Sequence, residues 1–173
     1  MQTWISENWF SALSIIAIII GGIFALLQYR KSIQLRRAEF LNQIIEKLRF
    51  DDEIVKTMYT IDYDQNWYNE SFHESGEKEF LMDKLLSYLS YICYLISQHN
   101  ITKDESSILE YELRRVCESK SVQSYLFNLY HFSKHRNSLC SFEYLINYGH
   151  KEKIISDDFF DIQNPEFTHY LNF

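Results

Sequence analysis

Proline and glycine are the scarcest structural signals in this chain of 173 residues, which has one proline, Pro165, and four glycines. So few turn-forming residues exclude a fold made of many tight turns, and they also exclude a Pro- or Gly-rich disordered chain. No stretch of useful length alternates apolar and polar residues as a half-buried strand does. With 13 tyrosines and 13 phenylalanines available for a core, the sequence predicts an all-α protein.

Cysteine and the common catalytic motifs are also sparse. Cys93, Cys117 and Cys140 are odd in number and lack CxxC spacing, so we expect three free thiols rather than a disulfide framework. The chain has no Gly-rich phosphate loop and no G-x-S-x-G nucleophile motif. We therefore expect no catalytic residues, no bound cofactor and no resident metal: the sequence predicts a protein that is not an enzyme.

Charge is missing altogether from residues 8–29, NWFSALSIIAIIIGGIFALLQY. At about 1.5 Å per residue, a helix over this stretch is roughly 33 Å long, close to the ~30 Å hydrocarbon core of a bilayer. Its leucine, isoleucine and phenylalanine side chains each favour insertion by about 0.3–0.6 kcal/mol. The stretch predicts one transmembrane helix.

The residues that flank this stretch predict its orientation. Glu7 is the only charged side chain before it, whereas four basic residues follow it, so the positive-inside rule places the C-terminal side in the cytoplasm. The residues expected at the membrane interface are Trp4, Trp9, Tyr29, Arg30, Lys31, Arg36 and Arg37. A cleaved signal peptide is the rival interpretation, but it requires a basic start, a shorter apolar core and a small-x-small cleavage site.

Small residues recur at every fourth position of the same stretch. Ala17, Gly21 and Ala25 share one helix face, on which two backbones can approach closely. Chance spacing is the alternative, because glycine and alanine are common in membrane spans. The pattern favours self-association of the span and hence a homo-oligomer.

Charge divides the chain into a basic beginning and an acidic remainder. Residues 1–37 hold four Lys/Arg and one Glu, whereas the rest holds 13 Lys/Arg and 23 Asp/Glu. This balance suits contact between the basic residues and anionic lipid, and it argues against general nucleic-acid binding. The predicted organisation is a short extracytoplasmic N-terminus, a span, a basic stalk helix, a cytoplasmic helical domain and a packed tail (1–7, 8–29, 30–50, 51–153 and 154–173).

Helical periodicity and capping signals predict a multi-helix bundle in the cytoplasmic domain. The strongest helix runs from Glu77 to about Gln98, and Thr102 with Glu105 forms a capping box for another that continues to about Glu118. We expect Ser121 to begin the next helix, and Gly149 to follow the last helix as its C′ residue. The stretch 60–79, TIDYDQNWYNESFHESGEKE, has no periodicity and is expected to be a loop that crosses the domain.

Two small basic groups within the acidic domain are candidate sites for an anionic ligand such as a small nucleotide signal. Their members are Arg114, Arg115 and Lys120 in one, and Lys134, His135 and Arg136 in the other. The alternative, which these sequence patterns favour, is that each group is an ordinary solvated helix face. A third site hypothesis is a zinc enzyme built on His131, His135 and Cys140, but the HFSKHRN stretch lacks the glutamate that a metalloprotease helix needs.

The order of these parts resembles an uncharacterised family of bacterial single-pass membrane proteins, the DUF4760 type. The resemblance lies in the N-terminal span, the basic juxtamembrane helix, the Tyr/Asp/Trp loop and the segment LMDKLLSYLSYICYLISQHNITKDE. It implies a location and a class, an accessory of mobile elements or defence loci, and it carries no chemistry.

From these observations we expect a membrane-anchored helical interaction or effector module in bacterial anti-phage defence. It would act by binding a cytoplasmic protein partner or signal and by oligomerising, which perturbs the membrane. The alternative is a passive scaffold that tethers a soluble partner enzyme.

Overall fold

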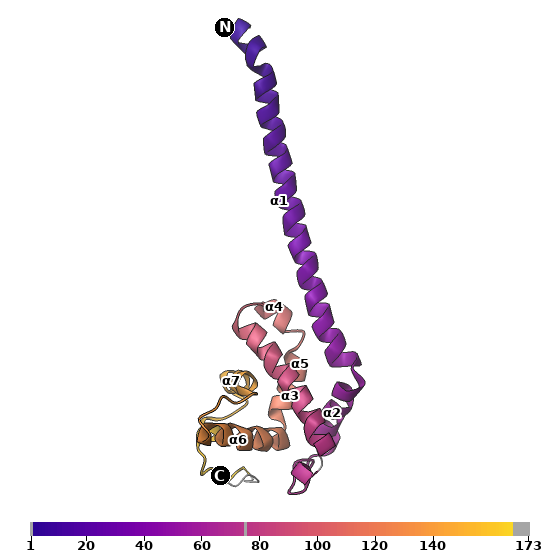
Figure 1. Ribbon diagram of the computed structural model, residues 1–173, viewed down its shortest axis with the longest axis vertical. Coiled ribbons are helices and arrows are strands. Elements are labelled where there is room, and N and C mark those ends of the chain that lie inside the picture. Colours follow the sequence, from indigo (N-terminus) through magenta and orange to yellow (C-terminus); the bar gives the residue numbers. More distant parts are fainter. Residues whose placement is uncertain (1, 75, 168–173) are drawn as a thin grey trace. The chain divides into compact units, whose positions relative to one another are not determined.

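The computed structural model describes residues 2–74 and 76–167, with side chains described from Trp9 onward. Within these residues the chain is all-helical and has no strand, so the predicted fold class is confirmed at this level. The elements, labelled in Figure 1, are α1 (Gln2–Phe50), α2 (Asp52–Tyr63), η1 (Phe72–Glu74), α3 (Gly76–Ser97), α4 (Lys103–Ser106), α5 (Glu110–Glu118), α6 (Lys120–His135), α7 (Glu143–Lys151) and η2 (Asp157–Phe160).

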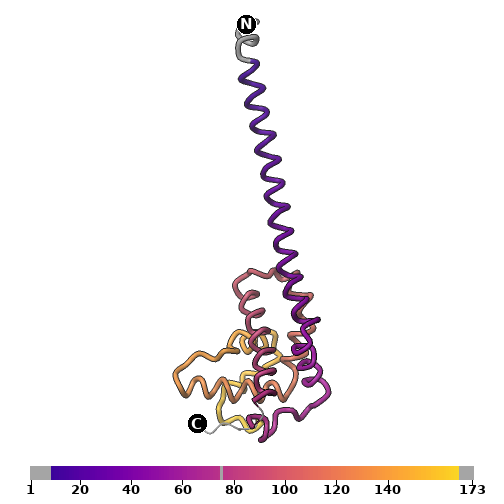
Figure 2. The backbone as a smooth tube through the Cα atoms, turned by 45° about the vertical axis from the view of Figure 1, so that its right-hand side comes forward, coloured from indigo at the N-terminus to yellow at the C-terminus, as the bar shows by residue number. Residues whose placement is uncertain are grey.

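The chain divides into two compact units, Met1–Ile44 and Ile45–Phe173. The described part of the first unit lies within α1, and Figure 2 shows this helix without a break beyond its grey start. The helices predicted over 8–29 and 30–50 are therefore parts of one continuous helix. The last turns of α1, after Ile44, belong to the second unit, where Leu48 is buried.

The core of the second unit forms around α3. Leu85, Leu86, Leu89 and Ile92 on this helix are fully buried, and α3 packs against both α2 and α7, as Figure 1 shows. Helix α5 packs against α6 and α7 and adds Leu113 to the same core. The apolar face of α3 is thus broad because the helix has neighbours on more than one side.

Local hydrogen bonds explain where several helices begin. Asp51 caps α2, because its Oδ1 accepts from the backbone nitrogens of Glu53 and Ile54 at 3.1 Å. The predicted capping box is confirmed at α4: Glu105 Oε2 accepts from the Thr102 nitrogen at 2.7 Å, and Thr102 Oγ1 accepts from the Glu105 nitrogen at 3.3 Å. The strong helix predicted from Glu77 is also confirmed.

Two helix boundaries differ from the predictions. The helix expected from Thr102 to Glu118 is broken after Ser106, where the hydroxyls of Ser106 and Ser107 donate to carbonyls three residues back and compete with the helical ladder. The cap of α6 is Ser119 and not Ser121, whose hydroxyl instead donates to the Gln65 carbonyl.

The prediction for Gly149 was wrong. This residue lies inside α7, which continues to Lys151, and it is not the C′ residue of that helix. A Cβ atom at this position would lie 2.7 Å from Ile155 Cδ1 and 3.5 Å from Cys117 Sγ. The glycine is therefore required by close packing, and not by a positive φ angle.

The stretch 154–167 lies against α6. Its Phe159 and Phe167 are buried, and their rings contact Phe127 of α6 at centroid distances of 5.7 and 4.7 Å. Residues 168–173 of the predicted packed tail lie outside the described residues.

Candidate functional site

The first candidate is the apolar segment of α1. In the part of the chain that the structure describes, α1 is the one helix long and apolar enough to cross a membrane, and none of its most apolar stretch is buried. Its large apolar side chains are exposed; for example, Phe10 is 68% exposed and Ile18 is 73% exposed. Contiguous apolar surface of this size is rare on a soluble monomer.

The predicted self-association face is open. Ala17, Gly21 and Ala25 follow one another at helical spacing along α1, and all three are exposed. A Cβ atom at Gly21 or at the neighbouring Gly22 would meet nothing within 4 Å. Among the described residues, nothing therefore requires glycine at either position.

The predicted interface residues bracket the apolar segment. Trp9 and Tyr29 are 49% and 65% exposed, and the basic side chains of Arg30, Lys31, Arg36 and Arg37 follow Tyr29 on exposed turns of α1. Trp4 lies outside the residues whose side chains are described.

In the first predicted anion group both arginines are paired with carboxylates. Arg115 forms a two-pronged ion pair with Asp62 of α2 and also donates to the Met58 carbonyl at 3.3 Å. Arg114 lies between Glu110 and Glu118 on its own helix, at 3.9 and 3.3 Å. Lys120 is exposed at the start of α6 and lines a cleft together with Asp62 and Glu118. Acidic partners thus offset much of the positive charge of this group.

The second predicted anion group lies at the other end of α6, roughly 20 Å from the first at 1.5 Å per residue. Its Lys134 approaches Glu143 at 3.8 Å and the Tyr130 ring at 5.1 Å, while Arg136 covers the Phe132 ring at 4.5 Å. His135 is exposed in the last turn of α6. The structure does not bring the two groups together into one site.

The zinc hypothesis finds no site among the described residues. Those residues contain no group of three or more His, Cys, Asp or Glu side chains placed to hold a metal ion. His131 is buried, with Nε2 3.1 Å from the Phe159 carbonyl oxygen, and therefore ties α6 to η2. Cys140 is buried as well, and burial raises the pKa of its thiol.

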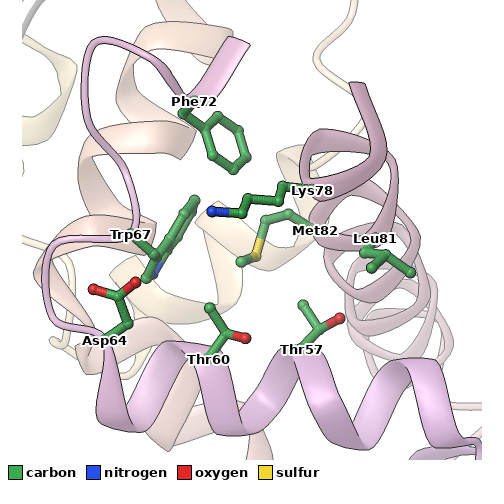
Figure 3. Close-up of a pocket in the computed structure, with 8 residues that line it drawn as sticks. All are labelled: Thr57, Thr60, Asp64, Trp67, Phe72, Lys78, Leu81 and Met82. Carbon is green, nitrogen blue, oxygen red and sulfur yellow. The ribbon is translucent and has the colours of Figure 1, made fainter. Parts of the chain in front are cut away.

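A pocket in the second unit was not predicted from the sequence. It is small and lies between α2, the loop after it and the start of α3 (Figure 3). Its lining residues are Thr57, Thr60, Asp64, Trp67, Phe72, Lys78, Leu81 and Met82. The walls are largely apolar, with one amino group, one carboxylate and two hydroxyls.

Two polar groups of this pocket have no partner among the described residues. Trp67 is 5% exposed and its Nε1 donates no hydrogen bond; Figure 3 shows the nitrogen-bearing edge of its ring turned toward α2. A buried donor without an acceptor costs about 1–3 kcal/mol. Lys78 is exposed, and no described carboxylate lies within ion-pair distance of its amino group.

Behind Phe72, a cluster of aromatic rings and hydrogen bonds holds the pocket wall in place. The Phe72 ring contacts Trp67 and Tyr125 at centroid distances of 5.1 and 5.4 Å. Tyr125 donates from its hydroxyl to Asp83 Oδ1 at 2.6 Å, and burial raises the pKa of that carboxyl above its usual value. On the same side, His73 Nδ1 lies 3.2 Å from Glu79 Oε1.

The sequence holds one signal for this pocket: Trp67, Tyr68 and Phe72 fall within six positions of an otherwise polar stretch without periodicity. Aromatic residues in a polar stretch indicate that it packs against the rest of the domain, and here all three are buried. Lys78 and Met82 approach them only through tertiary folding, which periodicity does not reveal.

Comparison of the chain with protein-family models, with curated proteins and with solved structures finds no match.

Proposed function

We propose that this protein is a single-pass membrane-anchored module that acts by binding and assembly. In this proposal residues 8–29 cross the bacterial inner membrane and the second unit lies in the cytoplasm. One observation carries it: a single uninterrupted helix, Gln2–Phe50, joins an exposed apolar segment to a compact domain with its own core. Burying this segment in lipid is favourable by about 25 cal/mol for each Å² of apolar surface that is removed from water.

The proposed assembly uses the small-residue face of α1. Without a hydrophobic driving force between helices in lipid, association depends on close backbone packing, which Ala17, Gly21 and Ala25 permit. Because α1 has no break between this face and the second unit, two associated spans bring two domains close together.

The assembly is tested by the mass of the full-length protein in detergent, with Gly21→Leu as the test and Gly22→Leu as its control. Both glycines are free of neighbours within the chain, but Gly22 lies about 100° around the helix from the small-residue face. We expect a defined oligomer for the wild type and for Gly22→Leu, and a monomer for Gly21→Leu. Equal masses for all three proteins would leave the span as a tether only, as in a passive scaffold.

For the biological setting we propose anti-phage defence, on the architectural resemblance alone. If the span is an effector, Gly21→Leu abolishes protection of expressing cells in a phage plating assay, whereas Gly22→Leu retains it. If an unrelated apolar span supports the same protection, the chain is a scaffold for another protein.

A further inference from the structure

We propose that an exposed tyrosine patch on α2 and α5 docks against the same patch of a second copy of this chain. The patch consists of the rings of Tyr59, Tyr63 and Tyr111 together with the guanidinium group of Arg115. It gives two copies a contact in the second unit, in addition to the contact through α1, and it therefore rests on the proposed assembly.

Printed contacts join these side chains into one surface. The Tyr59 and Tyr63 rings of α2 stack at a centroid distance of 5.8 Å and an interplanar angle of 11°. The guanidinium carbon of Arg115, on α5, lies 6.0 Å from the ring centroids of both Tyr59 and Tyr111. The ion pair of Arg115 with Asp62 joins the two helices at this point. These contacts limit the freedom of the rings before a partner binds, which lowers the entropic cost of docking.

The size of the patch suits the centre of a protein interface. Tyr59, Tyr63 and Tyr111 are 53%, 81% and 70% exposed. At about 150–250 Å² for a whole aromatic side chain, they offer roughly 300–500 Å² of surface. A standard interface buries about 800 Å² of each partner. The patch is thus too small to hold two free domains together by itself.

Local charge favours a second copy as the partner. Residues 38–173 carry 13 Lys/Arg and 23 Asp/Glu, so the domain as a whole repels a second copy of itself. The segments that carry the patch, 56–63 and 110–118, hold three basic and four acidic residues, and Arg49 pairs with the buried acid, Glu112. Two acidic domains can therefore meet at this patch without net repulsion.

The composition of the patch also favours a protein over a charged ligand. Its one charged member, Arg115, is already paired with Asp62, so it offers no free charge that would select a nucleic acid or an acidic peptide. Tyrosine and arginine are enriched at protein interfaces, where they carry much of the binding energy.

The anchor compensates for the small area of the patch. Two copies whose spans associate are held close together, so the contact between their patches forms within one assembly. An effective concentration in the millimolar range is enough to populate a contact that is too weak for free domains. A contact of one patch with its own copy is isologous, so it closes on two copies and does not extend into a filament.

The test is cross-linking of the full-length protein in its membrane with a short bismaleimide. The native cysteines are all buried and should give little background. Tyr63→Cys and, in a separate protein, Tyr111→Cys place a reporter in the patch, and Leu139→Cys is an equally exposed control outside it. We expect both patch reporters to give a product of twice the chain mass of 20.9 kDa. The control should give at least about fivefold less.

A charge placed in the patch tests whether the two patches meet face to face. Tyr59→Glu, added to the Tyr111→Cys protein, sets like charges against each other across the contact and should lower cross-linking by about fivefold or more. Tyr91→Glu on α3 is the matched control, because it changes a tyrosine of similar exposure outside the patch. It should leave the cross-link unchanged. Circular dichroism checks that each variant is folded.

Equal cross-linking from the patch reporters and from Leu139→Cys would overturn the proposal, and so would unchanged cross-linking in folded Tyr59→Glu. A product of any other mass would show that a different protein occupies the patch, and would overturn it as well. The mass in detergent reports the α1 contact separately. An oligomer without patch cross-links overturns the patch contact alone, whereas patch cross-links from a chain that is monomeric in detergent support the patch and overturn the span association.

Discussion

At the scale of single residues, Gly149 shows how close packing can require a glycine inside a helix. Glycine there lowers helix propensity by about 1 kcal/mol relative to alanine. The space for a Cβ atom is nevertheless taken by Ile155, whose Cδ1 and Cγ1 would lie 2.7 and 2.9 Å away. Since Ile155 is itself buried, it cannot turn outward without exposing apolar surface.

We therefore expect Gly149→Ala to lower the free energy of unfolding by about 1–3 kcal/mol, through overpacking. Gly76→Ala is the matched control: Gly76 is also helical, but a Cβ atom there meets nothing within 4 Å, so stability should stay the same or rise by up to about 1 kcal/mol. Chemical denaturation of both variants measures the difference. A neutral Gly149→Ala would show that Ile155 moves aside easily.

A second residue-scale feature is the bond from Tyr125 to Asp83. Burial raises the pKa of Asp83 above its unfolded value of 3.8, while the Tyr125 hydrogen bond acts to lower it. A raised pKa in the folded state means that the protonated carboxyl favours folding. That stability is fully present below pH 3.8 and is lost as the pH rises through the folded-state pKa.

Tyr125→Phe removes the hydroxyl that stabilises the charged carboxylate, so it should raise the pKa of Asp83 further. We expect the variant to lose about 1–2 kcal/mol at pH 7, where Asp83 is charged, and less near pH 4. Denaturation curves at the two pH values test this. A loss that is the same at both would mean that the hydroxyl acts through packing alone.

At the scale of elements, an ion pair between Arg49 and Glu112 links the end of α1 to α5. Arg49 Nη2 lies 3.0 Å from Glu112 Oε1, while Oε2 of this buried carboxylate has no partner among the described residues. Leu48 is buried beside it, and Lys47 lies 5.0 Å from the centre of the Tyr88 ring. These contacts fix which face of the last turns of α1 meets the domain.

Arg49→Met should therefore destabilise the second unit by about 1–3 kcal/mol, because it leaves Glu112 buried and unpaired. The double variant Arg49→Met with Glu112→Gln should recover part of this loss, since a neutral amide costs less to bury than a lone charge. Thermal unfolding of the single and double variants measures the coupling. Full stability in Arg49→Met would contradict a stabilising role for the Arg49–Glu112 ion pair.

The sequence predicted elements better than it predicted sites, for physical reasons. The α1 continuity, the α3 stripe and the capping box of Thr102 depend on neighbours within a few positions, and all are found. The boundary at Ser106 and the packing of Gly149 depend on contacts that only the folded chain provides. The same holds for Arg115, whose acidic partner Asp62 lies 53 positions away.

At the scale of the whole molecule, a basic segment joins an apolar helix to an acidic domain. The chain has a net charge of −7, yet its first 37 residues are positive, and these are the residues proposed to lie in or beside lipid. The pocket, the buried cysteines and the aromatic cluster all belong to the second unit. We therefore propose that α1 spans the membrane once, with this unit in the cytoplasm.

The most direct measurement is cysteine labelling on intact cells with a membrane-impermeant maleimide. Cys93, Cys117 and Cys140 are all buried and should give little background. Thr3→Cys and Gln34→Cys place single reporters on either side of the proposed span. We expect labelling of the Thr3→Cys protein on intact cells, and of the Gln34→Cys protein only after the cells are opened. The opposite pattern, or labelling of both on intact cells, would contradict this orientation.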